Sequence, residues 1–535
     1  MRAEAALSPS NQTDSANSFL LIENNNDDNI FIATTKLDPR ITGSNKWTGL
    51  KYSGSGSSAG TQQSLGYMGT YVNVPVTSNY KLDMWLDNSP VEHPFIGWRC
   101  INWYAGCNLE TSKIDPATTD SNGFYGAQNV GTGAKWLHAM LSDSFYQYLR
   151  QMQTGSSFTT TINGCYTSAN YDAGAGQRCK DQSTGSWRKS TVTHTKIGHM
   201  RIINTNSLQE VFINSDGEPT IGEGNAECQY IIIGTTTATR RSGLSCKMVN
   251  YTLQHTGISN TTIRIYPVIN HAALASAVDN RDFQFSLDGN NWTRGNSETY
   301  DYNFNDMKAA DSIYIFISSN FFKKLVELGI SDISTRDLFN IRFRNTVSVE
   351  SGYYEFSTSN ELIIKPRNFS ISILSDEYTT APSREGRVGA EEPSLDFGYI
   401  VTTSGRTAAD EVQIKVTGPT EVINGRSYCI FSSPDNQKKV PFPASLSFIN
   451  QTGAVRTLEA GCDGNWRDMN DALWVSTPWL DTSTGDIGLM NKTNVKFSIP
   501  MNDPISQRTV DNNSWYGDVS ASGEIHVKAT WRNAE

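Results

Sequence analysis

The C-terminal stretch GDVSASGEIHVKATWRNAE, residues 517–535, decides the fold class of its domain. Its apolar residues Ile525, Val527, Ala529 and Trp531 alternate with polar ones. A period of two residues is typical of a β-strand with one buried face. Only Arg532 to Glu535 follow this strand. We therefore expect that, if the domain needs a further core strand, another chain supplies it.

Strand-like runs separated by polar turns recur along the whole chain. Two stretches instead have a helical pattern: residues 134–152, with apolar residues at three- and four-residue steps, and a shorter stretch from Ser319 to Gly329 with a capping residue at each end. Gly, Ser, Thr and Asn are abundant, and charged residues are sparse, which favours turn-rich β structure. The clearest strand candidates are residues 30–34, 229–234, 262–269, 312–318, 369–374, 411–417 and 494–500.

The length of 535 residues predicts about three domains at roughly 150 residues each. Residues 379–393, rich in Thr, Pro, Ser, Glu and Gly, have the composition of a linker. Beyond the linker, residues 394–535 have the size and strand content of an immunoglobulin-like sandwich. A weaker boundary near Cys246 separates residues 19–246 from 247–378. Residues 1–18 are expected to be a flexible N-terminus or the remnant of an export signal, because Ala3-Glu4-Ala5 has a small-x-small form.

The eight cysteines fall into local couples, and no spacing among them is typical of a zinc site. Eight cysteines allow 105 connectivities, of which pairing between neighbours is the simplest. Four disulfides would indicate an oxidising compartment outside the cytoplasm. The expected pairs are Cys100 with Cys107, Cys165 with Cys179, Cys228 with Cys246, and Cys429 with Cys462.

The net charge of −10 comes without basic clusters, which argues against a nucleic-acid partner and against an anionic membrane surface. No run of about 18 apolar residues is present, so we expect no membrane insertion. The seven histidines are scattered, and we expect neither a metal site nor a cofactor. The sequence Gly56 to Gly60 matches the G-x-S-x-G form of a hydrolase, but its low-complexity surroundings are better explained as a loop.

Two groups of residues are candidates for ligand binding. Trp98, Arg99, Trp103 and Tyr104 surround the Cys100–Cys107 loop and could present aromatic rings to a sugar or protein; the alternative is that at least two of the aromatic residues belong to the core. The adjacent pair Arg240 and Arg241 could bind a carboxylate or sulfate; the alternative is an exposed pair without a partner.

Several long stretches of the sequence carry a specific resemblance to a known family. They are DDNIFIATTKLDPRITGSNKWTGLKYSGSG, RCINWYAGCN, FYQYL, VFINSDGEPTIGEGNAEC, RSGLSCKMVNYTL, ESGYYEFSTSNELIIKPRNFSISILSDEYT, LDFGYIVTTSGRTAADEV and VSASGEIHVKATWRN. These stretches resemble the tip adhesins of the Escherichia coli common pilus family, also called Mat fimbriae. The similarity runs from about Ser18 to Asn533.

The resemblance implies a chaperone–usher pilus component that is exported through the periplasm to the fimbrium on the cell surface. It implies that residues 394–535 form a pilin domain that lacks its last strand. Its partners would be a periplasmic chaperone, an outer-membrane usher, the major pilin subunit and a host-cell glycan or protein receptor. The apolar groove would be lined by Ile525, Val527, Ala529 and Trp531, facing Val412, Ile414 and Val416.

The predicted fold class is therefore all-β: multi-domain immunoglobulin-like β-sandwiches with a few short helices. The predicted function is that of a non-enzymatic fimbrial tip adhesin that binds host-cell or biofilm ligands. Two alternatives stay open. One is an exported carbohydrate-active β-sandwich enzyme, which would need a pair of carboxylates converging in a cleft. The other is a structural initiator of pilus assembly without receptor binding.

Overall fold

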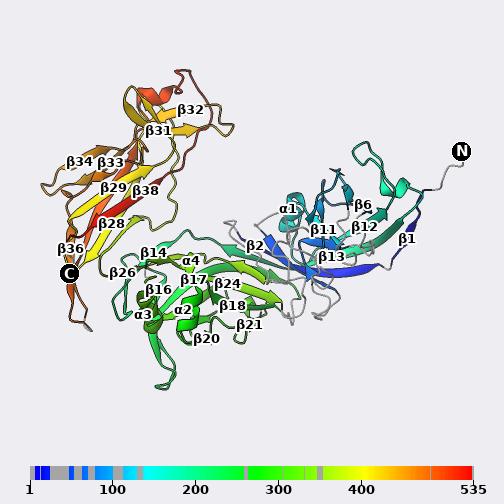
Figure 1. Cartoon of the computed structure of the whole chain (residues 1–535), viewed down its shortest axis with the longest axis horizontal. Helices are drawn as coiled ribbons and strands as arrows, with labels where there is room; N and C mark the ends of the chain where they lie inside the picture. The colour runs from blue at the N-terminus through cyan, green and yellow to red at the C-terminus, as the bar shows by residue number, and fades with distance from the viewer. Residues whose placement is uncertain are drawn as a thin grey trace.

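The computed structural model describes residues 6–12, 14–24, 47–53, 63–69, 79–100, 113–128, 137–257, 263–303, 305–330, 332–345, 353–481 and 484–532. These residues form mostly β-strands in several sheets, with a few short helices, which confirms the all-β multidomain class. Figure 1 shows three bodies in a bent row. We name them the N-terminal body (residues 6–203), the middle body (204–367) and the C-terminal body (368–532). No helix in the described ranges is long and apolar enough to cross a membrane.

The N-terminal body is built on two long antiparallel strands, β12 (Ser157–Thr167) and β13 (Ser186–Ile203). Its core lies between this sheet, a smaller four-stranded sheet and helix α1 (Asp143–Gln151), with Phe19, Phe124 and Phe145 all at most 1% exposed. The other elements are β1 (Pro9–Asn11), β2 (Ser15–Asn24), β3 (Trp47–Ser53), β4 (Gln63–Ser64), β5 (Tyr67–Gly69), β6 (Lys81–Leu86), β7 (Phe95–Cys100), β8 (Lys113–Ile114), β9 (Thr118–Thr119), β10 (Gly123–Gln128), β11 (Leu137–Leu141) and η3 (Cys179–Asp181).

The helix expected over residues 134–152 is wrong for residues 137–141, and residues 134–136 lie outside the described residues. Residues 137–141 form β11, which pairs with β5 and β7, and only residues 143–151 form α1. The side chain of Ser142 accepts a hydrogen bond from the backbone N–H of Phe145 and so caps the helix. Apolar residues at positions 137, 140 and 141 fit a helical stripe, but strand pairing within the small sheet satisfies their backbone groups instead.

The stretch expected to be a flexible N-terminus or export-signal remnant, residues 1–18, contains ordered strands. β1 pairs in parallel with β13, with Pro9 opposite Trp187. β2 begins at Ser15 and also pairs in parallel with β13. Its residues Phe19 to Ile22 are at most 1% exposed, so hydrophobic burial explains why this segment is held in the sheet.

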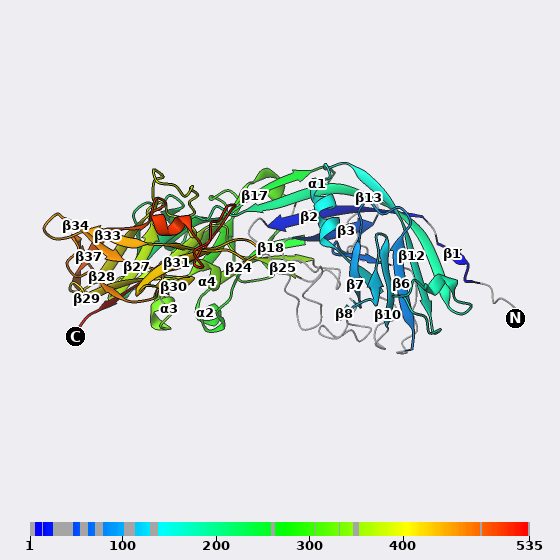
Figure 2. The same ribbon diagram turned by 90° about the horizontal axis from the view of Figure 1, so that it is seen from above.

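One sheet runs without interruption from the N-terminal body into the middle body. Residues 198–203 of β13 pair with residues 250–255 of β17 (Arg241–His255), as Figure 2 shows where the two bodies meet. The other half of β17 pairs with β16 and β22 inside the middle body. The boundary expected near Cys246 therefore falls within a strand, and Cys246 lies opposite Cys228 on β16.

The middle body packs strands and short helices around a core that includes Phe283, Phe321 and Phe343, all 0% exposed. The second predicted helix is present as α3 (Ser319–Glu327), and Gly329 after it has a φ of +70°. The elements of this body are β14 (Leu208–Ile213), β15 (Pro219–Ile221), β16 (Cys228–Ile233), β17, β18 (Ile263–Ile269), α2 (Ala272–Ala277), β19 (Phe283–Ser286), β20 (Thr293–Arg294), β21 (Tyr302–Asn303), η4 (Asp306–Ala309), β22 (Ser312–Ser318), α3, β23 (Ile333–Ser334), α4 (Thr335–Leu338), β24 (Phe339–Asn345), β25 (Tyr353–Phe356) and β26 (Glu361–Pro366).

The C-terminal body consists of one larger sheet facing two smaller ones across a shared core. The larger sheet has the order β27-β28-β37-β33-β34, with β36 also paired to β37; the smaller sheets are β35-β29-β38 and β30-β31-β32. Its elements are β27 (Ser370–Ser375), β28 (Leu395–Gly405), β29 (Glu411–Thr417), β30 (Thr420–Ile423), β31 (Arg426–Ser432), β32 (Lys439–Phe442), β33 (Ser445–Ile449), β34 (Val455–Glu459), β35 (Arg467–Asp468), β36 (Val475–Leu480), β37 (Ile487–Ile499), η5 (Pro504–Gln507) and β38 (Glu524–Thr530).

The segment expected to be a linker, residues 379–393, connects two strands of one sheet. β27 comes before it and pairs with β28 after it, from Ser370 opposite Ser404 to Ser375 opposite Tyr399. The C-terminal sheet therefore begins at Ser370 rather than at residue 394. A Pro- and Gly-rich composition indicates a connection without regular structure, but it does not tell whether the strands on each side share a sheet.

Candidate functional site

The last strand, β38, lies at the edge of its sheet. β38 pairs with β29, with Val527 opposite Ile414 and Ile525 opposite Val416, and in the described residues it has no second strand partner (Figure 1). β27, at the edge of the facing sheet, runs close to β38 without pairing with it. The outer edge of β38 thus presents backbone N–H and C=O groups that another strand could pair with.

Apolar side chains next to this edge are incompletely covered. On β29, Val412, Ile414 and Val416 are at most 3% exposed, whereas the residues opposite them on β38 are only partly buried. Partly buried apolar residues also lie on the facing sheet. We call the apolar residues of these two neighbouring edge strands the edge row: Ile525, Val527 and Ala529 of β38, and Ile371 and Ile373 of β27.

Trp531 lies just past β38 and is tied to the start of the C-terminal sheet. Its indole N–H donates a hydrogen bond to the carbonyl oxygen of Thr407 (3.0 Å), and its ring lies edge-on to Phe369, with ring centroids 5.6 Å apart. Gly405 lies under the indole, because a Cβ at this position would be 3.0 Å from its nitrogen. Trp531 therefore closes one end of the edge row.

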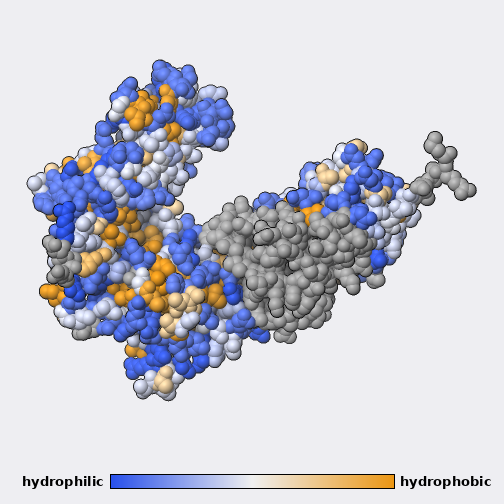
Figure 3. Space-filling view, in the orientation of Figure 1, coloured by the Kyte–Doolittle hydropathy of each residue, from blue (hydrophilic) through white to orange (hydrophobic). Residues whose placement is uncertain are grey.

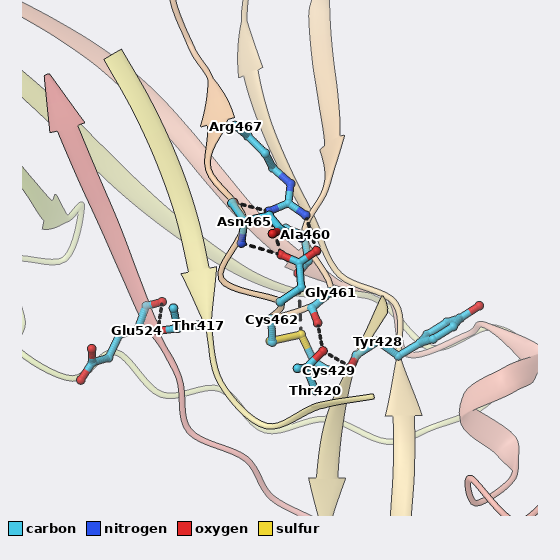
Figure 4. The surroundings of a disulfide bond; sticks show 11 residues. Thr417, Thr420, Tyr428, Cys429, Ala460, Gly461, Cys462, Asn465, Arg467 and Glu524 are labelled. Carbon is cyan, nitrogen blue, oxygen red and sulfur yellow. Dashed lines mark hydrogen bonds and ion pairs between the residues drawn. A yellow bond between two sulfur atoms is a disulfide. The ribbon is translucent and has the colours of Figure 1, made fainter. Parts of the chain in front are cut away.

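A disulfide lies near Thr417, the last residue of β29 (Figure 4). Cys429 on β31 is bonded to Cys462, and the Thr420 hydroxyl donates to the carbonyl oxygen of Gly461 (2.6 Å). Burial raises the pKa of Asp463, but hydrogen bonds that include two from Arg467 bring it below its usual value. The N–H of Gly464 donates to the carbonyl oxygen of Val416 (2.9 Å), which links this braced loop to β29.

The other expected disulfides are present where the structure describes both cysteines. Cys165 is bonded to Cys179 and Cys228 to Cys246. Cys107 and the side chain of Cys100 lie outside the described residues, so the fourth pair stays a prediction.

The aromatic cluster expected to bind a ligand is not brought together in the described residues. Trp98 is 0% exposed and belongs to the core of the N-terminal body, so it is not available to a ligand; the alternative that at least two of the aromatic residues are core stays open for the others. Trp103, Tyr104 and the side chain of Arg99 lie outside the described residues. An aromatic pattern in a sequence does not tell whether a ring lies in the core or is exposed for ligand binding, because proteins use aromatic side chains in both places.

The arginine pair in the middle body does not act as a unit. The guanidinium of Arg241 donates to the buried carboxylate of Asp282 (3.0 Å), which also accepts hydrogen bonds from Ser318 and Asn320. Arg240 is exposed. Because Arg241 is already paired with Asp282, binding of one anion by both Arg240 and Arg241 would require breaking that ion pair.

A polar depression in the N-terminal body was not predicted from the sequence. It lies beneath the loop between Cys165 and Cys179 and is lined by Lys81, Asn170, Asp172 and Gln177 among others. The cysteine couple was its only sequence signal, since Lys81 is far from the loop in sequence. No cluster of His, Cys, Asp and Glu side chains suited to a metal ion is found in the part of the chain that is described.

The chain matches three family models along nearly its whole length. These are the E. coli common pilus adhesin EcpD N-terminal domain (residues 7–200), the EcpD middle domain (204–361) and the EcpD C-terminal domain (368–529). Proteins named Fimbria adhesin EcpD from E. coli K12 and from E. coli O18:K1:H7 are each 64% identical over 531 residues, which cover 99% of this chain and 96% of the relative.

Solved structures give a much weaker likeness. CfaE, described as the adhesive subunit of CFA/I fimbria of enterotoxigenic E. coli, is 10% identical, with a TM-score of 0.21 over 61% of this chain and 89% of that one. A CsuC–CsuE chaperone–tip adhesion subunit complex of Acinetobacter baumannii is 8% identical, with a TM-score of 0.18 over 54% of this chain and 91% of that one. These scores are too low to support an argument.

Proposed function

The chain belongs to the family of E. coli common pilus adhesins, and we propose that it is a non-enzymatic adhesin at the tip of a surface pilus. In this proposal the N-terminal body, alone or with the middle body, binds a host-cell or biofilm ligand. The C-terminal body joins the protein to the pilus shaft. The observation that carries the second part is the unpaired outer edge of β38 beside the edge row.

The attachment is donor-strand complementation. An extended segment of the major pilin pairs with the outer edge of β38, so that main-chain hydrogen bonds supply affinity. Alternate side chains of the donor cover Ile525, Val527 and Ala529, which are half-buried without it. Covering apolar surface is worth roughly 25 cal/mol per Å². Affinity and register therefore both come from features already present on β38.

The same edge explains the need for assembly partners. Exposed strand edges and apolar rows promote aggregation, so a periplasmic chaperone would occupy the edge before assembly at an outer-membrane usher. The donor segment of the major pilin would then replace the chaperone. The disulfides support passage through an oxidising compartment, as export to a surface fimbrium requires.

The test uses the purified full chain and a synthetic peptide matching the N-terminal extension of the cognate major pilin. Hydrogen exchange of residues 524–530 and thermal unfolding are measured with increasing peptide. We expect protection of β38 and a melting temperature that rises with peptide concentration, because the peptide binds only the folded state. A peptide in which alternate apolar residues are replaced by Asp is the matched control. If the unmodified peptide changes neither quantity, donor-strand attachment is excluded.

The adhesive part of the proposal is tested separately on assembled fibres. Cells carrying fibres with and without this protein are compared for attachment to host cells. Equal attachment would leave only a structural role in assembly.

A further inference from the structure

The depression in the N-terminal body has the size of a small-molecule site. Its volume is about 450 Å³, within the range of roughly 300–1,000 Å³ that ligand pockets occupy. It is formed by the start of β6, the middle of β10 and the loop that follows β12. β6 and β12 lie at the end of the molecule opposite the C-terminal body (Figure 1). The depression thus lies in the body farthest from the end that would join a shaft.

A buried carboxylate holds its walls in place. Asp83 is 0% exposed and accepts hydrogen bonds from the backbone N–H of Gly126 (2.7 Å) and of Cys179 (2.6 Å) and from the hydroxyl of Tyr171. These three partners come from β10, from η3 and from the loop after β12. The Cys165–Cys179 disulfide closes the same loop. The walls are therefore fixed before any ligand arrives, which lowers the entropy cost of binding.

Small residues keep the depression open. A Cβ at Gly126, whose φ is +71°, would lie 2.8 Å from the Cβ of Ala173 and 3.0 Å from that of Ala117. All three residues line the depression. A larger residue at any of them would reduce the volume of the depression.

Three polar side chains that line the depression, Asn170, Asp172 and Gln177, each accept a hydrogen bond from another group of the protein through one side-chain oxygen. The ammonium of Lys81 donates to the side-chain oxygen of Asn170 (3.0 Å) and to the carbonyl oxygen of Tyr171 (2.9 Å). The side-chain oxygen of Gln177 accepts from the N–H of Asp172 (2.8 Å), and one carboxylate oxygen of Asp172 accepts from the N–H of Ala175 (3.1 Å). The amide NH2 groups of Asn170 and Gln177 and the second oxygen of Asp172 make no hydrogen bond to the described residues.

This set of free groups complements hydroxyls. An amide NH2 donates and a carboxylate accepts, and a hydroxyl can serve both roles at once. Lys81 and Asp172 also balance each other in charge, so the rim does not favour an anion. Neighbouring hydroxyls on one rigid ring fit such an alternation of donors and acceptors, whereas an acidic sugar would bring its carboxylate near Asp172.

We infer that this depression binds a neutral carbohydrate, with Asp172, Asn170 and Gln177 contacting its hydroxyls and Asp83 acting as a positioning residue. The inference rests on the proposed adhesive function and gives it a site and a ligand class. It places ligand binding in the N-terminal body, away from Arg240 and Arg241.

The test is ligand-observed NMR of the purified full chain with the methyl glycosides of galactose, mannose, fucose and N-acetylglucosamine, and with N-acetylneuraminic acid as the anionic probe. We expect at least one neutral sugar to bind and N-acetylneuraminic acid not to bind. The variants N170D, D172N and Q177E each keep the internal hydrogen bond while changing the group offered to the ligand. Each should weaken binding about tenfold, the loss expected for one hydrogen bond to a polar ligand. Q153E, an exposed change outside the depression, is the control.

Several outcomes would overturn the inference: no neutral sugar binds, N-acetylneuraminic acid binds more tightly, or binding survives in all three variants. Unchanged melting temperatures would show that the variants fold. Attachment of fibres to cells separates this inference from the proposed function. If fibres attach through the protein but D172N and Q177E attach equally well, the site is wrong and the adhesin remains. If fibres lacking the protein attach equally well, the proposed adhesive function itself fails.

Discussion

The indole of Trp531 lies edge-on to the ring of Phe369, so the segment just past β38 is held to the residue just before β27. These residues are far apart in the sequence but close the same end of the edge row. The contact links the edges of the two facing sheets at a place where no backbone pairing between β27 and β38 is seen in the described residues.

Replacing Trp531 by Ala should loosen this end of the C-terminal body. Aromatic pairs contribute about 0.5–1.5 kcal/mol beyond the area they bury, and the hydrogen bond to Thr407 is also lost. We expect a loss of about 1–3 kcal/mol in local stability, measured as faster hydrogen exchange in β27 and β38. Tyr516→Ala, at an 85% exposed aromatic residue, is the control and should change exchange in neither strand.

A charge placed in the edge row should prevent the donor strand from binding. We predict that Val527→Asp weakens binding of the major-pilin peptide by at least about tenfold, because an unpaired carboxylate would be buried by the donor. Lys528→Gln changes the neighbouring residue, which is exposed, and should bind the peptide like the unaltered chain. Peptide titration followed by fluorescence anisotropy measures both. Equal affinities for the two variants would contradict the proposed position of the donor.

Removal of the Cys429–Cys462 disulfide should destabilise the C-terminal body more than removal of Cys165–Cys179 destabilises the N-terminal body. The closed loops span 33 and 14 residues, and the chain-entropy model gives about 3.7 and 3.0 kcal/mol. Paired Cys→Ser variants would be compared by urea unfolding and by hydrogen exchange in each body. A larger loss from the shorter loop would mean that native-state contacts, and not loop entropy, decide the effect.

Glu23 should stabilise the N-terminal body at neutral pH and lose this effect in strong acid. Burial raises its pKa, but hydrogen bonds from His199, Arg201 and Tyr146 outweigh that and lower the pKa from 4.5 to about 2. A lowered carboxylate pKa stabilises the folded state above pH 4.5, and the contribution disappears as the pH falls through about 2. At ~1.4 kcal/mol per pH unit the contribution is about 3 kcal/mol.

Glu23→Gln should therefore reduce the free energy of unfolding at pH 7 by about 3 kcal/mol and match the unaltered chain near pH 2. Urea unfolding across this range, with hydrogen exchange of β2 as the local probe, tests the expectation. Glu92→Gln, at an exposed carboxylate of the same body that lies outside the helices and strands, serves as the control. A loss at pH 7 that persists unchanged at pH 2 would show that shape, not charge, is responsible.

Glu210 should have the opposite effect on stability from Glu23, because its ionised carboxylate should destabilise the folded chain at neutral pH. It is 6% exposed and lines a cavity of about 100 Å³ between the middle and C-terminal bodies. One of its carboxylate oxygens makes no hydrogen bond to the residues that the structure describes, and burial raises its pKa above 4.5. A raised carboxylate pKa destabilises the folded state once the group ionises, so this cost is present at neutral pH and vanishes as the pH falls toward 4.5.

Glu210→Gln should accordingly stabilise the chain at pH 7.5 by about 1–3 kcal/mol, and the gain should shrink toward pH 4.5. Hydrogen exchange of β14 and β27 reports on this interface directly. Glu223→Gln, at an exposed carboxylate of the same cavity that pairs with Lys492, should change stability by less than about 1 kcal/mol. A gain that does not depend on pH would contradict the assignment to ionised Glu210.

Local patterns in the sequence predicted the elements that depend on local chemistry. The strands at residues 312–318 and 411–417 have the predicted bounds. In 411–417 the buried residues alternate with a period of two, whereas 312–318 is a short apolar run that is buried on both faces. The helix from Ser319 was recognisable from Gly329 after it, but its N-terminal cap is Ser318 and not Ser319, which is the first residue of the helix. Residues 137–141 were misassigned because their spacing fits a helix, while pairing with β7 made them a strand.

Features that depend on contacts distant in sequence were not predictable in this way. The place of β27 in the C-terminal sheet arises from pairing across residues 376–394, which have no regular alternation. The depression under the loop after β12 combines Lys81, Gly126 and Asp172, which come from three separate elements. The open edge at β38 could be anticipated, because the alternating apolar residues and the edge position both belong to one strand and do not depend on contacts distant in sequence.

The strand pairing between β13 and β17 also has a mechanical meaning. If one end of the molecule is attached to a surface and the other to a fibre, flow pulls the N-terminal and middle bodies apart. Residues 198–203 and 250–255 lie side by side in antiparallel register. Tension along the strands would load these hydrogen bonds together, in shear, instead of opening them one after another. Under such tension the paired strands would resist separation of the two bodies, and the junction would not act as a hinge.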